Sequence, residues 1–116
     1  MVWIHGGSNV SGNSDFYDPS ELVKTQNVIV VSINYRLGPF GWFRHPNITS
    51  NSENAEDQSG NYGNLDTVQA LEWVQKNIGY FGGDASNVTI FGESAGGYNV
   101  AALLSAKLSL IHISEP

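Results

Sequence analysis

The chain has 116 residues, of which 41% are hydrophobic and 14% charged, a composition typical of a single globular domain. Five basic residues against eleven acidic ones give a net charge of −6, and because the basic residues are scattered along the chain, the sequence excludes a surface that binds nucleic acid. The absence of cysteine excludes disulfide bonds and thiolate metal sites, and the histidines and carboxylates show no metal-ligand spacing. No stretch of the sequence approaches the about 18 consecutive apolar residues that a membrane-spanning helix needs.

The first part of the chain contains two segments typical of buried strands. Val2 to His5 is a short apolar run that leads into Gly-Gly, so its loop end is the first place where we expect function. The residues Asp18-Pro19-Ser20-Glu21 predict the cap and first turn of a brief helix. Val28 to Tyr35 is β-branched on both faces, which favours a parallel strand covered by helices.

Two loops and an amphipathic helix are expected next. Leu37 to Phe43 is an aromatic stretch punctuated by Gly and Pro, and Pro46 to Gly63 is polar and without hydrophobic periodicity, so both are predicted to be loops. Asn64 to Ile78 predicts an amphipathic helix that Gly79 ends. Its apolar residues recur at spacings of three and four: Leu65, Val68, Leu71, Val74 and Ile78.

The last elements complete an alternation of strands and helices. Val88 to Phe91 predicts a third short strand, and Ala95 to Ser105 predicts a helix with an apolar side formed by Val100, Leu103 and Leu104. Three successive strand–helix units predict an α/β fold, with a parallel sheet and right-handed crossovers.

The stretch FGESAGG contains the pattern glycine-x-serine-x-glycine around Ser94. The pattern alone is weak, but here it joins a predicted strand to a predicted helix, which is the arrangement of a nucleophile elbow. Gly92 and Gly96 suit a strained turn, because a side chain at either position would crowd the backbone. We therefore interpret Ser94 as a nucleophile, with a serine in an ordinary turn as the alternative.

A nucleophilic serine also needs backbone NH groups that stabilise an oxyanion. The NH of Ala95 lies at the start of a helix, whose dipole favours negative charge. The glycine loop of His5, Gly6 and Gly7 follows an earlier strand and can bring further NH groups to the same point. Two separate motifs thus point to one site.

Four stretches of the chain resemble the type B carboxylesterase and cholinesterase family of α/β hydrolases. They are VWIHGG, VIVVSINYRLGPFGWF, GNYGNLDTVQALEWVQKNIGYFGGD and VTIFGESAGG, in the family's order. The resemblance implies a partial α/β-hydrolase fold, a short parallel sheet made of the family's strands 3, 4 and 5 in spatial order 4-3-5, with flanking helices. It also implies hydrolysis of a small-molecule carboxylic ester without a cofactor.

The resemblance assigns roles to particular residues. Ser94 would form the acyl-enzyme, and the NH groups of Gly7, Ser8 and Ala95 would form the oxyanion hole; Gly6, Gly92, Glu93 and Gly96 would surround them in the elbow and its supporting shell. Two positions depart from the family: Ser8 replaces a usual glycine, so donation there requires it to adopt the necessary φ and ψ, and Asn9 replaces a common aromatic residue. In the amphipathic helix, Asn64 and Thr67 replace the Leu and Gln often found around Asp66.

Several other residues allow two interpretations. His5 is expected to shape the oxyanion loop and not to act as the base. Glu93 is interpreted as a carboxylate supporting the nucleophile, with a buried ion pair to Arg36 as an equal alternative. The loop aromatics are expected to pack on the core more readily than to line a substrate pocket; they are Phe40, Trp42, Phe43, Tyr80 and Phe81.

The catalytic partners of Ser94 are expected later in the chain, because α/β hydrolases follow the order Ser, acid, His. After Ser94 the sequence contains only His112 and Glu115 as candidates, with no room for further strands. We therefore expect a fragment of a serine hydrolase that is inactive in isolation. The alternatives are a cholinesterase-like adhesion or binding module that lost the chemistry, and a reading frame without a functional product.

The segment LSLIHISEP, residues 108–116, continues no earlier pattern. It is the translation of CTG TCT CTT ATA CAC ATC TCC GAG CCC, which resembles a transposon-type adapter used for sequencing libraries. We interpret residues 1–107 as the partial hydrolase domain and residues 108–116 as a non-native tail. A natural amphipathic ending is the alternative.

Overall fold

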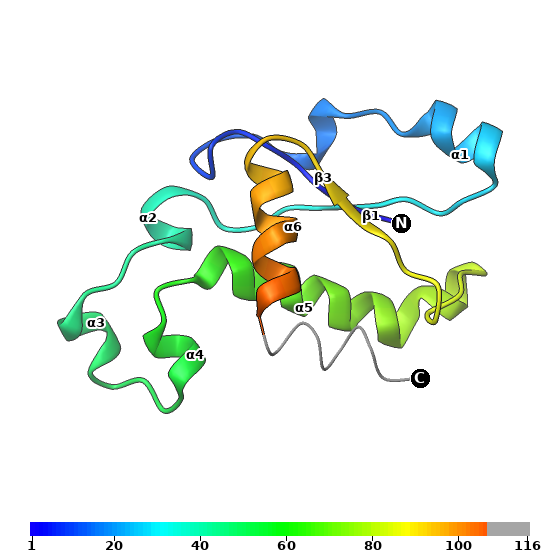
Figure 1. The fold of residues 1–116 in the computed structure, drawn as a ribbon. Helices are drawn as coiled ribbons and strands as arrows, with labels where there is room; N and C mark the ends of the chain where they lie inside the picture. The colour runs from blue at the N-terminus through cyan, green and yellow to red at the C-terminus, as the bar shows by residue number, and fades with distance from the viewer. Residues whose placement is uncertain (107–116) are drawn as a thin grey trace.

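A computed structural model of the chain describes residues 1–106. In this part of the chain the strands form one parallel three-stranded sheet (Figure 1). Its order is β2-β1-β3, with Ile4 paired to Ile33 on one side and to Gly92 on the other. The strands are β1 (Val2–Ile4), β2 (Val31–Ile33) and β3 (Ile90–Gly92). This arrangement confirms the α/β fold and the predicted order 4-3-5.

Helices flank the sheet and fill the connections between its strands. The α-helices are α1 (Ser20–Gln26), α2 (Gly38–Gly41), α3 (Pro46–Thr49), α4 (Ala55–Gln58), α5 (Tyr62–Asn77) and α6 (Ala95–Ser105), and two 3₁₀ turns are η1 (Ser14–Phe16) and η2 (Ile78–Phe81). In Figure 1, α6 runs from the end of β3 down to α5, which lies beneath the sheet. Among residues 1–106, no helix is long and apolar enough to cross a membrane.

The core lies between one face of the sheet and the two long helices. Val2 and Ile4 of β1 are 1% and 0% exposed and pack with buried residues of β2, α5 and α6. Side chains alternate along a strand, so Trp3 points to the opposite face of the sheet. There its indole ring contacts the rings of Tyr17 and Phe91. One face of the sheet is therefore covered by helices, and the other carries an aromatic cluster.

The buried face of α5 differs from the predicted apolar stripe. Its buried residues are Gly63, Thr67, Leu71 and Val74, whereas Leu65 is only half-buried. Gly63 lies against the indole of Trp42, where a side chain would not fit. Thr67 is fully buried, and its hydroxyl is satisfied there by donating a hydrogen bond to the carbonyl of Asn64 at 2.7 Å. Contact with Trp42 thus sets the start of the buried face.

Local hydrogen bonds create short helices where the sequence predicted loops. The predicted loop 37–43 contains α2, and the predicted loop 46–63 contains α3 and α4. Pro39 and Pro46 lie in the first turns of α2 and α3, where a fixed φ favours the helix. Asn54 caps α4 by accepting a hydrogen bond from the NH of Asp57 at 2.8 Å. Proline and capping residues form these single turns without an apolar period.

The second and third strands are shorter than the sequence predicted. Val28 to Val30 are not part of β2, and Val88 and Thr89 precede β3. The parallel ladder pairs Val2–Ile4 of β1 only with Val31–Ile33 and Ile90–Gly92, so these residues lie outside it. The interpretation of residues 108–116 as a non-native tail lies outside the described residues.

The two adjacent leucines of α6 have opposite environments. Leu103 is 1% exposed in the core, whereas Leu104 is 60% exposed, so the prediction that both belong to the apolar side was wrong for Leu104.

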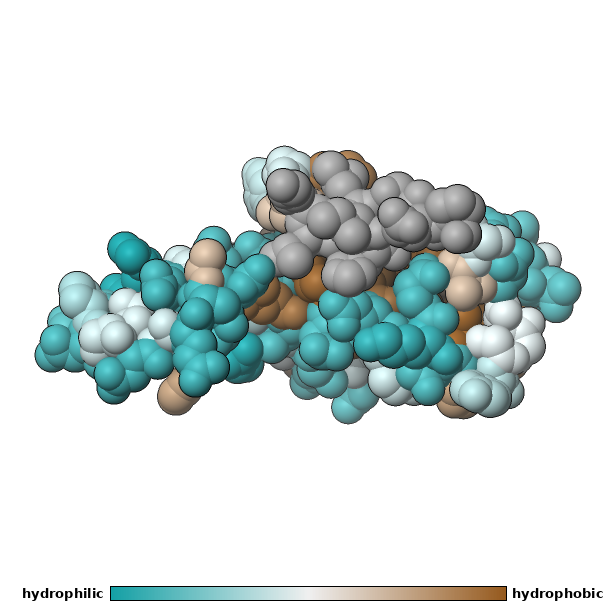
Figure 2. Space-filling view, turned by 90° about the horizontal axis from the view of Figure 1, so that it is seen from below, coloured by the Kyte–Doolittle hydropathy of each residue, from teal (hydrophilic) through white to brown (hydrophobic). Residues whose placement is uncertain are grey.

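A groove of about 430 Å³ between α5 and α6 is lined by Leu65, Val68, Ala102 and Leu103 among others. Figure 2 shows hydrophobic side chains near the middle of the face seen from below, with hydrophilic ones to either side.

We expect Leu103→Ala to lower the free energy of unfolding by about 2–5 kcal/mol, because it leaves a cavity in the core. Leu104→Ala, the matched control one residue away, should change it by less than about 0.5 kcal/mol. Urea unfolding followed by circular dichroism measures both. Equal losses for the two variants would contradict the assigned burial of α6.

Candidate active site

Ser94 occupies the turn between β3 and α6 in a strained backbone conformation. Its φ of 53° and ψ of −121° lie in a region that non-glycine residues rarely adopt, at a cost of about 1–3 kcal/mol. Hydrogen bonds fix the turn: the NH of Gly96 donates to the carbonyl of Glu93 at 2.8 Å, and the NH of Tyr98 donates to that of Ser94 at 3.1 Å. The side chain of Ser94 is exposed at the carboxyl end of the sheet. This geometry is that of a nucleophile elbow.

Two glycines of the elbow lie against the end of β1. A Cβ on Gly92 would lie 2.5 Å from the carbonyl carbon of Gly96 and 2.8 Å from the carbonyl oxygen of Ile4. A Cβ on Gly96 would lie 2.8 Å from the carbonyl oxygen of His5 and closer still to that of Ile4. Backbone therefore packs directly on backbone at this point, and only glycine fits at both positions.

The glycine loop leaves β1 beside this elbow. Gly6 is buried, and a Cβ there would lie 3.1 Å from the Cβ of Ser94. The next three residues all have positive φ: 105° at Gly7, 57° at Ser8 and 61° at Asn9. Ser8 thus takes a left-handed conformation although it has a side chain. The loop and the elbow meet at the same edge of the sheet.

The NH groups proposed for an oxyanion hole are available. Within residues 1–106, no backbone hydrogen bond uses the NH of Gly7 or of Ser8. The carbonyl of Gly7 instead accepts from the NH groups of Val10 at 3.0 Å and Ser11 at 3.1 Å, which folds the loop back on itself. The NH of Ala95 is the first of α6 and has no partner one turn earlier in the helix. The backbone can therefore offer these donors to an anion.

His5 lies beneath the loop and not beside it. Its side chain is 1% exposed, its Nδ1 lies 2.7 Å from the carbonyl oxygen of Gly6, and its ring stacks on Tyr35 at 4.5 Å. The hydroxyl of Tyr35 donates to the carbonyl of His5 at 2.5 Å. Burial raises the pKa of Tyr35 above its ordinary value, and a hydrogen bond with Asn99 lowers it in part. These contacts agree with a role for His5 in shaping the loop.

The alternative of a buried ion pair between Glu93 and Arg36 was wrong. Glu93 is exposed, and its Oε2 accepts a hydrogen bond from the hydroxyl of Tyr17 at 3.4 Å. Arg36 binds Asp66 of α5 instead, with Nη2 and Oδ1 2.8 Å apart and its backbone NH 2.8 Å from Oδ2. Arg36 follows β2 and Glu93 follows β3, and β1 lies between these strands. The sheet order itself separates the two side chains.

The loop aromatics are more exposed than expected. Trp42 packs edge-on against Tyr35 at 5.9 Å, which confirms the packing interpretation for this residue. Phe40 and Tyr80 are 80% and 88% exposed, so packing was the wrong expectation there, and Phe43 and Phe81 are also exposed. Trp42 and Phe43 line a shallow cavity of about 480 Å³ next to the glycine loop, together with Ser8, Asn9, Val10, Gly38 and Pro39. An apolar group can be held there.

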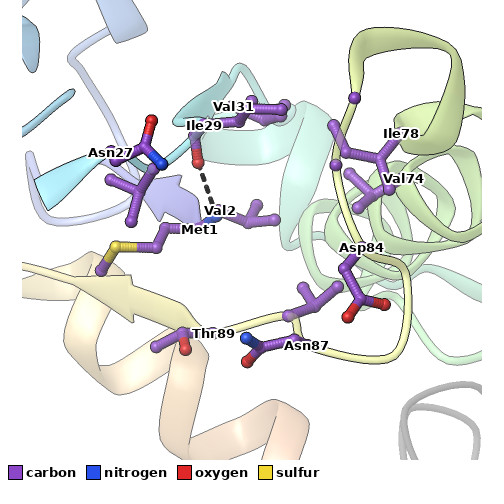
Figure 3. A pocket seen from close by; sticks show the side chains of 14 residues that line it. Met1, Val2, Asn27, Ile29, Val31, Val74, Ile78, Asp84, Asn87 and Thr89 are labelled. Atoms are coloured by element: carbon purple, nitrogen blue, oxygen red, sulfur yellow. Dashed lines mark hydrogen bonds between the residues drawn. The ribbon is translucent and has the colours of Figure 1, made fainter.

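A second cavity, of about 360 Å³, lies at the opposite end of the strands (Figure 3). Residues before or at the start of each strand line it, among them Met1, Ile29 and Thr89. The ammonium group of Met1 donates to the carbonyl of Ile29 at 2.7 Å, and burial lowers the pKa of this amino group. Because Ser94 follows the carboxyl end of β3, this cavity is separate from the elbow.

Residues 1–106 contain no cluster of side chains that could hold a metal ion.

Comparison with known proteins identifies relatives of this chain. A family model described as "Carboxylesterase family" matches residues 1–113. Liver carboxylesterase B-1 of Rattus norvegicus and cocaine esterase of Homo sapiens are each 50% identical over 109 residues, which are 94% of this chain and 18% of theirs. The chain thus spans about a fifth of the length of these curated relatives.

Solved structures give the same result. A PNB esterase superposes with a TM-score of 0.84 at 46% identity, over 99% of this chain and 24% of that one. A carboxylesterase of Geobacillus stearothermophilus superposes with a TM-score of 0.82 at 44% identity, over 93% of this chain and 23% of that one. The fold is therefore shared with esterases over nearly the whole chain.

We expect Gly96→Ala to lower the free energy of unfolding by about 1–3 kcal/mol, because the new methyl group forces β1 away from the elbow. Gly97→Ala is the matched control: its nearest neighbour would be 3.5 Å away, and alanine favours the helix by about 1 kcal/mol. Thermal unfolding of both variants tests the close approach. A neutral Gly96→Ala would show that the elbow does not pack on β1 as described.

Proposed function

The chain belongs to the carboxylesterase family, and on this premise we propose that it supplies the nucleophile and the oxyanion hole of a serine carboxylic-ester hydrolase. The observation that carries the proposal is the conformation of Ser94, which is held at φ 53° on an exposed turn beside the glycine loop. Such strain persists only where the surrounding structure enforces it, and it concentrates at functional sites.

The proposed reaction proceeds in two steps. The Oγ of Ser94 attacks the ester carbonyl carbon and loses its proton to a base, and the carbonyl oxygen becomes an oxyanion. The NH groups of Gly7, Ser8 and Ala95 stabilise this oxyanion. The intermediate then collapses, the C–O bond to the alcohol breaks, and the base protonates the departing alcohol. Water hydrolyses the acyl-enzyme by the same sequence and restores Ser94.

The base is not among the described residues. His5 is buried in the core, and His45 stacks on Phe43 and caps α3 by accepting a hydrogen bond from the NH of Asn47 at 3.2 Å. Figure 1 places α3 well away from the start of α6. We therefore assign the acid and the histidine of the triad to a part of the protein beyond residues 1–106. The 116-residue chain alone should not turn over an ester.

The substrate is proposed to be a small-molecule carboxylic ester with an apolar group. The cavity beside the glycine loop presents Pro39, Trp42 and Phe43, which suit an apolar acyl or alcohol portion. A binding module that lost its chemistry is the competing hypothesis. It has no use for a strained serine whose flanking glycines leave no room for a side chain, so the elbow favours the enzyme.

In the full-length protein that contains this chain, we expect Ser94→Ala to lower the rate of p-nitrophenyl butyrate hydrolysis by about 10³-fold or more. Ser105→Ala, a serine at the other end of α6 whose hydroxyl bonds the carbonyl of Ala102 at 2.9 Å, should retain activity. Release of p-nitrophenol measures both. Steady-state turnover by the isolated 116-residue chain that Ser94→Ala removes would overturn the assignment of the triad partners.

A further inference from the structure

We propose that Asn9 and Asn99 form an amide clasp that positions the oxyanion donors, an inference that rests on the proposed function. The two side chains bond each other in both directions. Nδ2 of Asn99 donates to Oδ1 of Asn9 at 2.9 Å, and Nδ2 of Asn9 donates to Oδ1 of Asn99 at 3.4 Å. A reciprocal pair fixes both the distance and the relative orientation of the two amides.

The clasp joins the two backbone segments that carry the proposed donors. Asn9 directly follows Ser8 in the glycine loop. Asn99 lies one turn after Ala95 on the same face of α6, and both are buried, at 3% and 6% exposure. Each amide is therefore next to, or one helical turn from, a donor NH. A shift of either segment would change the angle between the NH groups of Ser8 and Ala95.

Asn9 also holds the end of an unusual backbone run. Three consecutive positive φ values are uncommon outside glycine, and asparagine is one of the residues that tolerates this region. The carbonyl of Asn9 accepts a hydrogen bond from the NH of Gly38 at 2.7 Å. The side chain binds α6 and the main chain binds the segment after β2, so Asn9 fastens the loop on two sides.

Asn99 is an unusual residue for its position. Asparagine is a weak helix former, and a polar side chain in a buried helix face needs partners. Asn99 finds its partner in Asn9, with which it exchanges both amide hydrogen bonds. Separately, the hydroxyl of Tyr35 donates to the carbonyl of His5, the residue just before the glycine loop.

The clasp should act on the transition state and not on the substrate. Oxyanion donors that are fixed in advance stabilise charge that exists only after attack, so their misplacement lowers kcat and leaves KM nearly unchanged. Loss of one whole donor costs about 10²–10³ in kcat, so a donor that is displaced but present should cost about 10- to 100-fold.

The test uses the full-length enzyme with Asn9→Gly, which keeps the positive φ and removes the amide, and Asn99→Leu, which keeps the branched shape of the side chain and removes its hydrogen bonds. We expect each to lower kcat for p-nitrophenyl butyrate about 10- to 100-fold with KM within about twofold. The Ki of a trifluoromethyl ketone, whose bound oxyanion occupies the same hole, should rise in parallel. The double variant should be no worse than the worse single one, because one interaction is lost in both.

Leu103→Ala separates positioning from stability, since it weakens α6 one turn beyond Asn99 without touching the clasp. Its melting temperature should fall while kcat and Ki stay at wild-type values. An active wild type with unchanged kcat and Ki in Asn9→Gly and Asn99→Leu overturns the clasp alone. If Asn99→Leu does not fold, Asn99→Ser takes its place. A wild type without Ser94-dependent hydrolysis overturns the proposed function and the clasp with it.

Discussion

The contact between the end of β1 and the turn after β3 is the constraint on which the rest of the structure depends. Gly92 and Gly96 bring the elbow within touching distance of the carbonyls of Ile4 and His5, and the pairing of Ile4 with Gly92 holds this approach in register. Because no side chain intervenes, Ser94 cannot relax its backbone without separating β1 from β3. The strain at Ser94, the proposed nucleophile, is thus sustained by sheet pairing, and the glycine loop leaves β1 at the point where this pairing ends.

The topology brings the residues of the proposed site to one end of the sheet. In a parallel sheet the carboxyl ends of all strands meet at one edge, so the segments after β1 and β3 converge although they are far apart in sequence. The segment after β2 joins them there, because the NH of Gly38 bonds the carbonyl of Asn9. The other edge holds a cavity lined by the residues that lead into the strands. Three short strands are enough to bring the segments that follow them together at one edge of the sheet.

Sequence alone predicted the features that depend on local pattern. The parallel sheet and the bounds of α6 follow from periodicity, glycine placement and the strand–turn–helix motif around Ser94, whereas the strand order was implied only by the resemblance to the carboxylesterase and cholinesterase family. Features set by distant contacts escaped prediction. Val28 to Val30 look like strand but lie outside the paired residues of β2, the buried face of α5 is fixed by Trp42, and Arg36 binds Asp66 because β1 separates it from Glu93. Asn99 carried one weak signal, a polar residue one turn after Ala95 in an apolar helix.

The separation of Asn9 and Asn99 has a consequence for the order in which the protein is made. Their side chains meet across 90 residues of sequence, and β1 likewise pairs with β3, which is synthesised much later. A ribosome therefore releases the glycine loop long before the helix that fastens it, and contacts of such long range form late in folding. Until α6 emerges, the loop has neither its amide partner nor the elbow beside it. The contacts that fix the loop at this edge of the sheet therefore become possible only after α6 has been synthesised.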